Sequence, residues 1–91
     1  MNKEKRKSLG KAVTLLNDAQ EKLSQAKDIV EEVKDLEQES YDNLPESQQY
    51  GEKGDIMEEN VSELDDVVDE LDTAYDSIEE QIDAIQNVID K

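Results

Sequence analysis

The sequence predicts an all-α fold: an antiparallel helical hairpin of the coiled-coil type, which we expect to dimerise into a four-helix bundle. Three observations lead to this prediction. Apolar residues recur at spacings of three and four in two long stretches, which is the period of a helix. No Pro or Gly interrupts the chain between Lys11 and Asn43. The one Pro and two of the three Gly lie between the two stretches, where a turn is needed.

The first helix is expected over residues 8–41. In heptad notation, four apolar residues occupy position a and four occupy position d. They are Leu9, Leu16, Leu23 and Val30 at a, and Ala12, Ala19, Ala26 and Val33 at d. Beyond Val33 the heptad pattern is lost, and Leu36 and Tyr41 continue the apolar stripe with the drift of an ordinary helix.

The second helix is expected over residues 56–90 and has the more regular pattern. Position d is occupied by Met57, Leu64, Leu71, Ile78 and Ile85, and position a by Val61, Val68, Tyr75, Ile82 and Ile89. Asp55 is followed three residues later by Glu58, which predicts a capping box with Asp55 as the N-cap. Because the two helices are expected to pack on each other, we predict a single domain over residues 1–91.

The predicted connection covers residues 42–55. Pro45 disfavours helix at the preceding residue but can itself open a helix, so a short helical turn over residues 45–49 is possible. A connection of this length is usually self-packed or functional. We expect Tyr41, Leu44 and Tyr50 to close over this end of the hairpin.

The connection also carries a resemblance. Residues 37–49, which read Glu-Gln-Glu-Ser-Tyr-Asp-Asn-Leu-Pro-Glu-Ser-Gln-Gln, are followed by Glu-Lys-Gly-Asp at 52–55 and Met-Glu-Glu at 57–59. This pattern resembles a family of small acidic two-helix proteins of uncharacterised function, encoded by phages and mobile elements of Gram-positive bacteria. The resemblance implies a mobile-element origin and no catalytic residues.

Both apolar stripes are wider than positions a and d, which predicts that each hairpin packs against a second copy. Position g adds Leu15, Ile29 and Leu36 to the first stripe and Val67, Ala74 and Val88 to the second. The residues expected in the core or the dimer interface are Leu15, Leu16, Leu23, Ile29, Val30, Leu36, Leu64, Val67, Val68, Leu71, Tyr75, Ile78, Ile82 and Ile85. The alternative is a monomeric hairpin with some exposed aliphatic side chains.

Composition excludes several classes of function. The chain has no His and no Cys, and its net charge is -16. Zinc fingers and Cys/His nucleophilic dyads are therefore excluded, and a metal site would have to be built from carboxylates alone. DNA, RNA and anionic lipid would repel such a chain, because phosphate contacts need cations. No apolar run approaches the roughly 20 residues of a membrane span. We expect a cytoplasmic protein of the host bacterial cytosol.

Enzyme chemistry is also disfavoured. The acids of the second helix lie at positions b, c, e and f, on the solvent side, where a carboxylate keeps its ordinary reactivity and is a poor catalyst. No calcium-loop pattern or phosphate-binding Gly motif is present. We therefore expect no catalytic residues, no metal and no cofactor.

The charge is unevenly distributed. Residues 1–36 carry eight Lys or Arg and seven acids, whereas residues 37–91 carry 19 acids and two Lys, a net charge of -17. The basic cluster at residues 3–7 is expected beside the acidic C-terminal half of the second helix. In that helix, acids at positions e and b alternate at spacings of four and three, so six of them form one row about 27 Å long.

We interpret this row as the binding surface of a nucleic-acid mimic. Its residues, with the acids that broaden it, are Asp65, Asp66, Asp69, Glu70, Asp72, Asp76, Glu79, Glu80 and Asp83. Like charges at this spacing weaken a helix, so a row of one sign favours a role in binding a basic protein partner. The alternatives are a merely solvated face, and a helical interaction module that binds through its apolar stripe.

Overall fold

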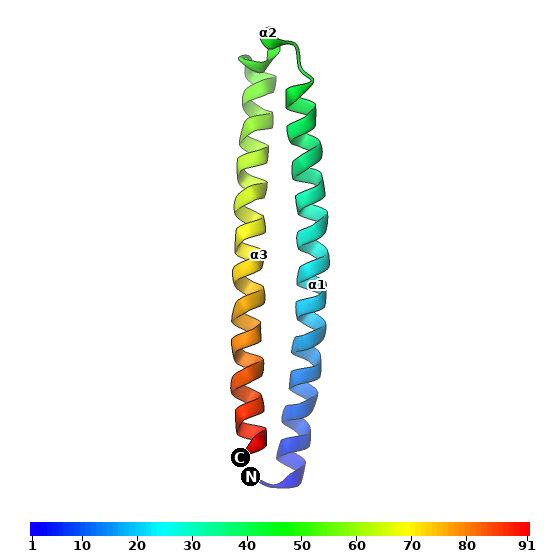
Figure 1. The fold of residues 1–91 in the computed structure, drawn as a ribbon, viewed down its shortest axis with the longest axis vertical. Helices are drawn as coiled ribbons and strands as arrows, with labels where there is room; N and C mark the ends of the chain where they lie inside the picture. Colours follow the sequence, from blue (N-terminus) through cyan, green and yellow to red (C-terminus); the bar gives the residue numbers. More distant parts are fainter.

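The computed structural model describes all 91 residues as two long antiparallel helices joined by a compact corner, with both termini at one end (Figure 1). Helix α1 spans Lys3–Asp42, the short α2 spans Glu46–Gln49, and α3 spans Glu52–Asp90. The Cα trace measures 69 × 14 × 13 Å. The prediction of an all-α hairpin is confirmed. Neither long helix contains an apolar stretch that could cross a membrane.

Helix α1 starts at Lys3, earlier than the predicted residue 8, because Asn2 caps it. The Asn2 side chain accepts a hydrogen bond from the backbone N–H of Lys5 at 2.8 Å, which satisfies one of the free donors of the first turn. Glu4 also complements the positive end of the helix dipole. The basic N-terminal segment is therefore helical.

The predicted capping box at Asp55 is wrong, because α3 begins one turn earlier. Gly51 is the N-cap in an extended conformation, and the N–H of Asp55 already donates to the Gly51 carbonyl at 3.0 Å. The extra turn brings the buried Gly54 against the end of α2. A Cβ at this position would overlap the carbonyl oxygen of Gln49, so the corner needs glycine here.

The apolar stripe of α3 faces α1 along the whole hairpin. Val68 and Ile82, both at position a, are the two buried hydrophobic residues. The other a and d residues of α3 are half-buried, apart from Tyr75, which is more exposed. The half-buried ones are Met57, Val61, Leu64, Leu71, Ile78, Ile85 and Ile89. The heptad pattern of the second helix therefore describes its packing correctly.

Helix α1 packs differently from its heptad pattern. Leu16, Leu23 and Val30 at position a are half-buried as expected, but Ala26 and Val33 at position d face solvent. Position e takes their place beside α3, with Gln20 buried and both Lys27 and Lys34 half-buried. The aliphatic stems of the two lysines can cover the apolar seam while their ammonium groups reach the edge.

Five residues expected in the core or the interface are exposed in the single hairpin. These are Leu15, Ile29, Leu36, Val67 and Tyr75. All except Tyr75 lie at position g, beside the seam and on the opposite side from position e. A two-helix hairpin covers each helix on one side only, so this edge has no neighbour within the chain.

The corner packs only in part as expected. Tyr41 and Leu44 are half-buried, but Tyr50 is 79% exposed. The expectation that Tyr50 closes over the hairpin end is wrong. It occupies the C-cap of α2, where most of its side chain is in contact with solvent.

Candidate functional site

A row of polar contacts joins α1 to α3 along one edge of the hairpin, and we call it the polar ladder. Its rungs are Gln20 with Glu79, Lys27 with Asp72, and Lys34 with Asp65, and the pair of Tyr41 and Glu58 continues the series at the corner end. Both helices advance by seven residues from one rung to the next, so every rung joins two e positions. The ladder therefore fixes which residues of α1 and α3 stand opposite each other.

The central rungs are short and charge-assisted. Lys27 Nζ lies 2.7 Å from an Asp72 carboxylate oxygen, and Lys34 Nζ lies 3.1 Å from one of Asp65. These hydrogen bonds raise the pKa of both lysines, and they outweigh the opposing effect of desolvation. The buried amide of Gln20 donates to a Glu79 carboxylate oxygen at 2.7 Å and to the Tyr75 carbonyl at 3.2 Å. No buried polar side-chain atom lacks a hydrogen-bond partner.

The Tyr41 rung makes the hairpin sensitive to alkaline pH. A hydrogen bond from its hydroxyl to the Glu58 carboxylate, assisted by desolvation and by the negative charge of Glu58, raises the pKa of Tyr41 from 10.0 to about 12. The folded state therefore holds this proton more tightly than the unfolded chain. The stabilisation is complete below pH 10 and is lost as the pH rises from there through about 12.

We therefore expect Tyr41→Phe to lower the free energy of unfolding below pH 10, because phenylalanine cannot donate to Glu58. The difference from the wild type should shrink as the pH approaches 12. Urea unfolding followed by circular dichroism at several pH values measures it. Glu58→Gln, which keeps an acceptor but removes the charge, should lower the pKa of Tyr41. A constant difference between Tyr41→Phe and the wild type across this pH range would contradict the assignment.

The structure divides the predicted acidic row into two groups. Asp65, Asp72 and Glu79 belong to the polar ladder and hold α1. The carboxylates of the other six residues bind no side chain of the chain. They are Asp66, Asp69, Glu70, Asp76, Glu80 and Asp83, and we call them the unpaired acidic face. All six are exposed.

The unpaired acidic face lies on the outer side of α3. Asp69, Asp76 and Asp83 at position b recur every seven residues, which places them roughly 10.5 Å apart. Asp66 and Glu80 at position f flank them. No Lys or Arg occurs between Gly54 and Asp90, so nothing on this helix neutralises the row. Such carboxylates can accept charge-assisted hydrogen bonds from the Lys and Arg of a partner.

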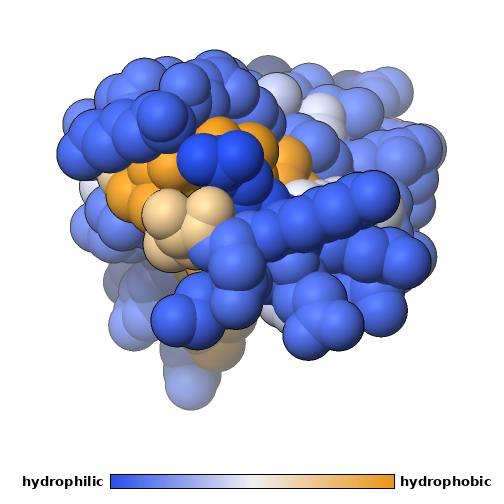
Figure 2. Space-filling model, turned by 90° about the horizontal axis from the view of Figure 1, so that it is seen from below, coloured by the Kyte–Doolittle hydropathy of each residue, from blue (hydrophilic) through white to orange (hydrophobic).

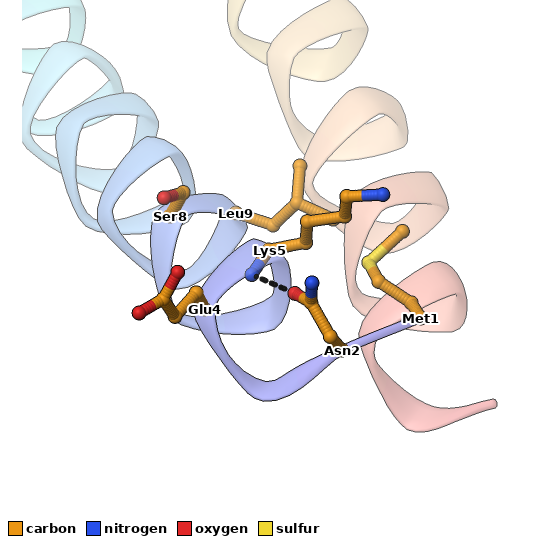
Figure 3. A pocket seen from close by; sticks show the side chains of 6 residues that line it. All are labelled: Met1, Asn2, Glu4, Lys5, Ser8 and Leu9. Carbon is orange, nitrogen blue, oxygen red and sulfur yellow. Dashed lines mark hydrogen bonds between the residues drawn. The ribbon is translucent and has the colours of Figure 1, made fainter.

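No group of carboxylates is placed to hold a metal ion. The largest hollow, about 530 Å³, lies at the N-terminal end and is lined by Met1, Asn2, Glu4, Lys5, Ser8 and Leu9 (Figure 3). Only Met1 and Leu9 in this lining are apolar. Figure 2 looks onto this end and shows apolar side chains between hydrophilic flanks. No hydrogen bond or ion pair joins the side chains of Glu4, Lys5 and Ser8 in this lining.

The basic N-terminal residues lie at the same end as the C-terminus of α3, as expected, but they form no ion pair there. The cations that neutralise α3 are Lys27 and Lys34, near the middle of α1. The polar ladder was missed by reading the apolar residues alone. Its signal is the seven-residue recurrence of Gln20, Lys27, Lys34 and Tyr41, matched by acids at the same interval in α3.

Comparisons of the chain with protein-family models, with curated proteins and with solved structures found no match.

Proposed function

We propose that the chain is a small acidic protein-binding protein that occupies the basic cleft of a host DNA- or RNA-binding protein, in the manner of an anti-restriction or anti-defence inhibitor. The observation that carries the proposal is the unpaired acidic face. Six exposed carboxylates on one helix have no partner within the chain, whereas the cations of α1 that reach α3 are bound to Asp65 and Asp72.

The cost of this arrangement supports a role in binding. Like charges three and four residues apart weaken a helix by some tenths of a kcal/mol per pair. Solubility alone is served by mixed charges, which α1 uses. A face of one sign creates a field that attracts a basic surface and speeds association with it. A mobile-element origin and a bacterial host are part of the proposal and rest on the resemblance of residues 37–49.

A second candidate function is supported by a different surface. Ile29, Val33 and Leu36 are exposed on one side of α1 and could bind a partner helix, as expected of a structural or regulatory interaction module. Binding through this strip would be driven by apolar contact and would depend little on salt.

We also propose that the functional unit is a homodimer that forms a four-helix bundle. The single hairpin exposes 6670 Å². A compact monomer of 10.4 kDa is expected to expose only about 5400 Å². Its radius of gyration of 20.3 Å also exceeds the roughly 12 Å expected for a compact chain of this length. Dimerisation through the exposed aliphatic side chains would bury part of this additional surface.

The test is capture from a bacterial lysate by the immobilised chain, followed by elution with either salt or a nucleic-acid duplex. The mimic predicts that nucleic-acid-binding proteins are retained at low salt and released by both treatments, because the duplex competes for the same cleft. Proteins that remain bound at high salt and are not displaced by the duplex would contradict the mimic hypothesis and favour the interaction module.

A further inference from the structure

An apolar strip runs along the edge of the hairpin that lies opposite the polar ladder. On α1 it consists of Ala26, Ile29, Val33 and Leu36, whose spacings of three, four and three are those of a helix–helix seam. Ile29 is 62% exposed, Val33 48% and Leu36 55%. Leu15, Val67 and Val88 extend the strip toward both ends and onto α3. We call these seven residues the apolar edge.

We propose that the apolar edge binds a second copy of the chain in an antiparallel orientation, with the two-fold axis perpendicular to the hairpin's long axis. The corner of each copy then lies beside the termini of the other. The inference rests on the homodimer proposed above, and it adds which edge forms the interface and which way the two hairpins run. It does not depend on the acidic partner.

The choice of edge follows from the polarity of the two edges. The polar ladder places paired charges and amides along positions e, and burying these pairs in an interface would cost their remaining hydration. The apolar edge presents aliphatic side chains, and the one hydrogen bond on its side runs from the Asn60 amide to Glu37 near the corner. A lateral face of about 69 × 14 Å is also large enough for the ~800 Å² per partner that a standard interface buries.

The orientation follows from the charges at the two ends. The terminal end is basic: it carries Lys3, Lys5, Arg6, Lys7 and Lys11, none of them in an ion pair, against the acids Glu4 and Asp90. The corner end is acidic: against the cation Lys53 it carries Glu39, Asp42, Glu46, Glu52, Asp55, Glu59 and Glu63. A parallel dimer would place like charge against like charge at both ends. An antiparallel dimer places each basic end beside an acidic one, which is attractive.

The positions of the apolar residues fit the same axis. The polar ladder pairs Gln20 with Glu79 and Lys27 with Asp72, so these residues mark equal heights along the hairpin. The midpoint between Leu15 and Leu36 on α1 and the midpoint between Val67 and Val88 on α3 both lie between these two pairs. A two-fold axis there brings Leu15 of one copy to the height of Leu36 of the other, as an isologous interface requires.

Distances between spin labels test the orientation of the two copies. The chain has no cysteine, so an introduced cysteine places one label at one known position in each copy. In the antiparallel dimer the two labels of Ser40→Cys should lie roughly 40 Å apart, since each is about 14 residues from the axis. The labels of Gln25→Cys, near the axis, should lie within roughly 20 Å of each other. Pulsed electron–electron double resonance measures both distances. A short Ser40 distance would establish a parallel dimer and overturn the proposal.

Sedimentation of variants tests the edge. Ile29→Gln combined with Leu36→Gln should convert a dimer of about twice 10.4 kDa into a monomer without loss of helix, because both side chains are exposed in the hairpin. Tyr50→Gln is the matched control, since it removes an exposed apolar side chain away from the edge. A dimer that survives the double substitution overturns the choice of edge. A monomeric wild type refutes the homodimer, yet leaves salt-sensitive capture through the acidic face intact.

Discussion

Gly54→Ala is expected to destabilise the hairpin by about 1–3 kcal/mol, the usual cost of overpacking a close contact. A Cβ at this position would overlap the carbonyl oxygen of Gln49 and lie 2.6 Å from its carbonyl carbon. Both are backbone atoms, so α2 or the first turn of α3 has to move. Thermal unfolding followed by circular dichroism measures the effect, which corresponds to about 4–8 °C per kcal/mol for a domain of this size.

Gly10→Ala is the matched control, because Gly10 lies in α1 with no atom within 4 Å of an added Cβ. Alanine there should stabilise the protein by about 0.5–1 kcal/mol, since glycine loses more backbone freedom in a helix. The two Gly→Ala substitutions therefore have opposite expected signs. If both substitutions stabilised the protein equally at one protein concentration, the close contact between Gly54 and Gln49 would be wrong.

Replacing Asp69, Asp76 and Asp83 with asparagine is expected to weaken the complex with a captured basic protein by at least about tenfold, roughly 1.4 kcal/mol. These carboxylates lie in one row on the outer face of α3 and bind nothing within the chain. The substitution therefore removes charge without releasing α1. Titration calorimetry gives the dissociation constant, and circular dichroism checks that the helices are retained.

The structure changes which acids are suitable for this test. Asp72 and Glu79 belong to the predicted acidic row, but they also hold Lys27 and Gln20. Their substitution would disturb the hairpin and the surface together, so a loss of binding would have two explanations. The three residues at position b avoid this ambiguity.

Most of the fold could be predicted from the sequence because α3 is so regular. Its a and d residues recur without a break from Met57 to Ile89, and an aliphatic stripe of that length can be buried only against another helix. The Pro and Gly residues between the two patterns indicated the position of the corner. Helix class, helix number and antiparallel arrangement follow from these features.

The packing of α1 could not be predicted in the same way. An apolar heptad pattern assigns Ala26 and Val33 to the seam, but a small alanine contributes little area, and lysine stems can cover an apolar surface as well. The ammonium groups of Lys27 and Lys34 also gain carboxylate partners from α3. The face of α1 that packs against α3 is therefore determined by ion pairs between the two helices. The residue pattern of α1 alone gives no information about these pairs.

The acidic row shows the same limit. Its residues and their common face are evident from spacing alone. The axial register of α1 against α3 determines which of these acids form a pair with α1. The corner sets this register. Because Gly51 starts α3 one turn earlier than the apparent cap at Asp55, the corner is shorter than the predicted connection.

We expect the position of the charge on α3, and not the amount of charge on the chain, to direct binding. Two triple variants, measured against the same captured protein at low salt, separate these two effects. One carries Asn at Asp69, Asp76 and Asp83. The other carries Glu21→Gln, Asp28→Asn and Asp35→Asn, which removes three exposed charges at the same seven-residue spacing from the outer face of α1. The α3 variant should bind at least about tenfold more weakly than the α1 variant, and its affinity should depend less on salt. Equal affinities for the two variants would mean that only the amount of charge matters.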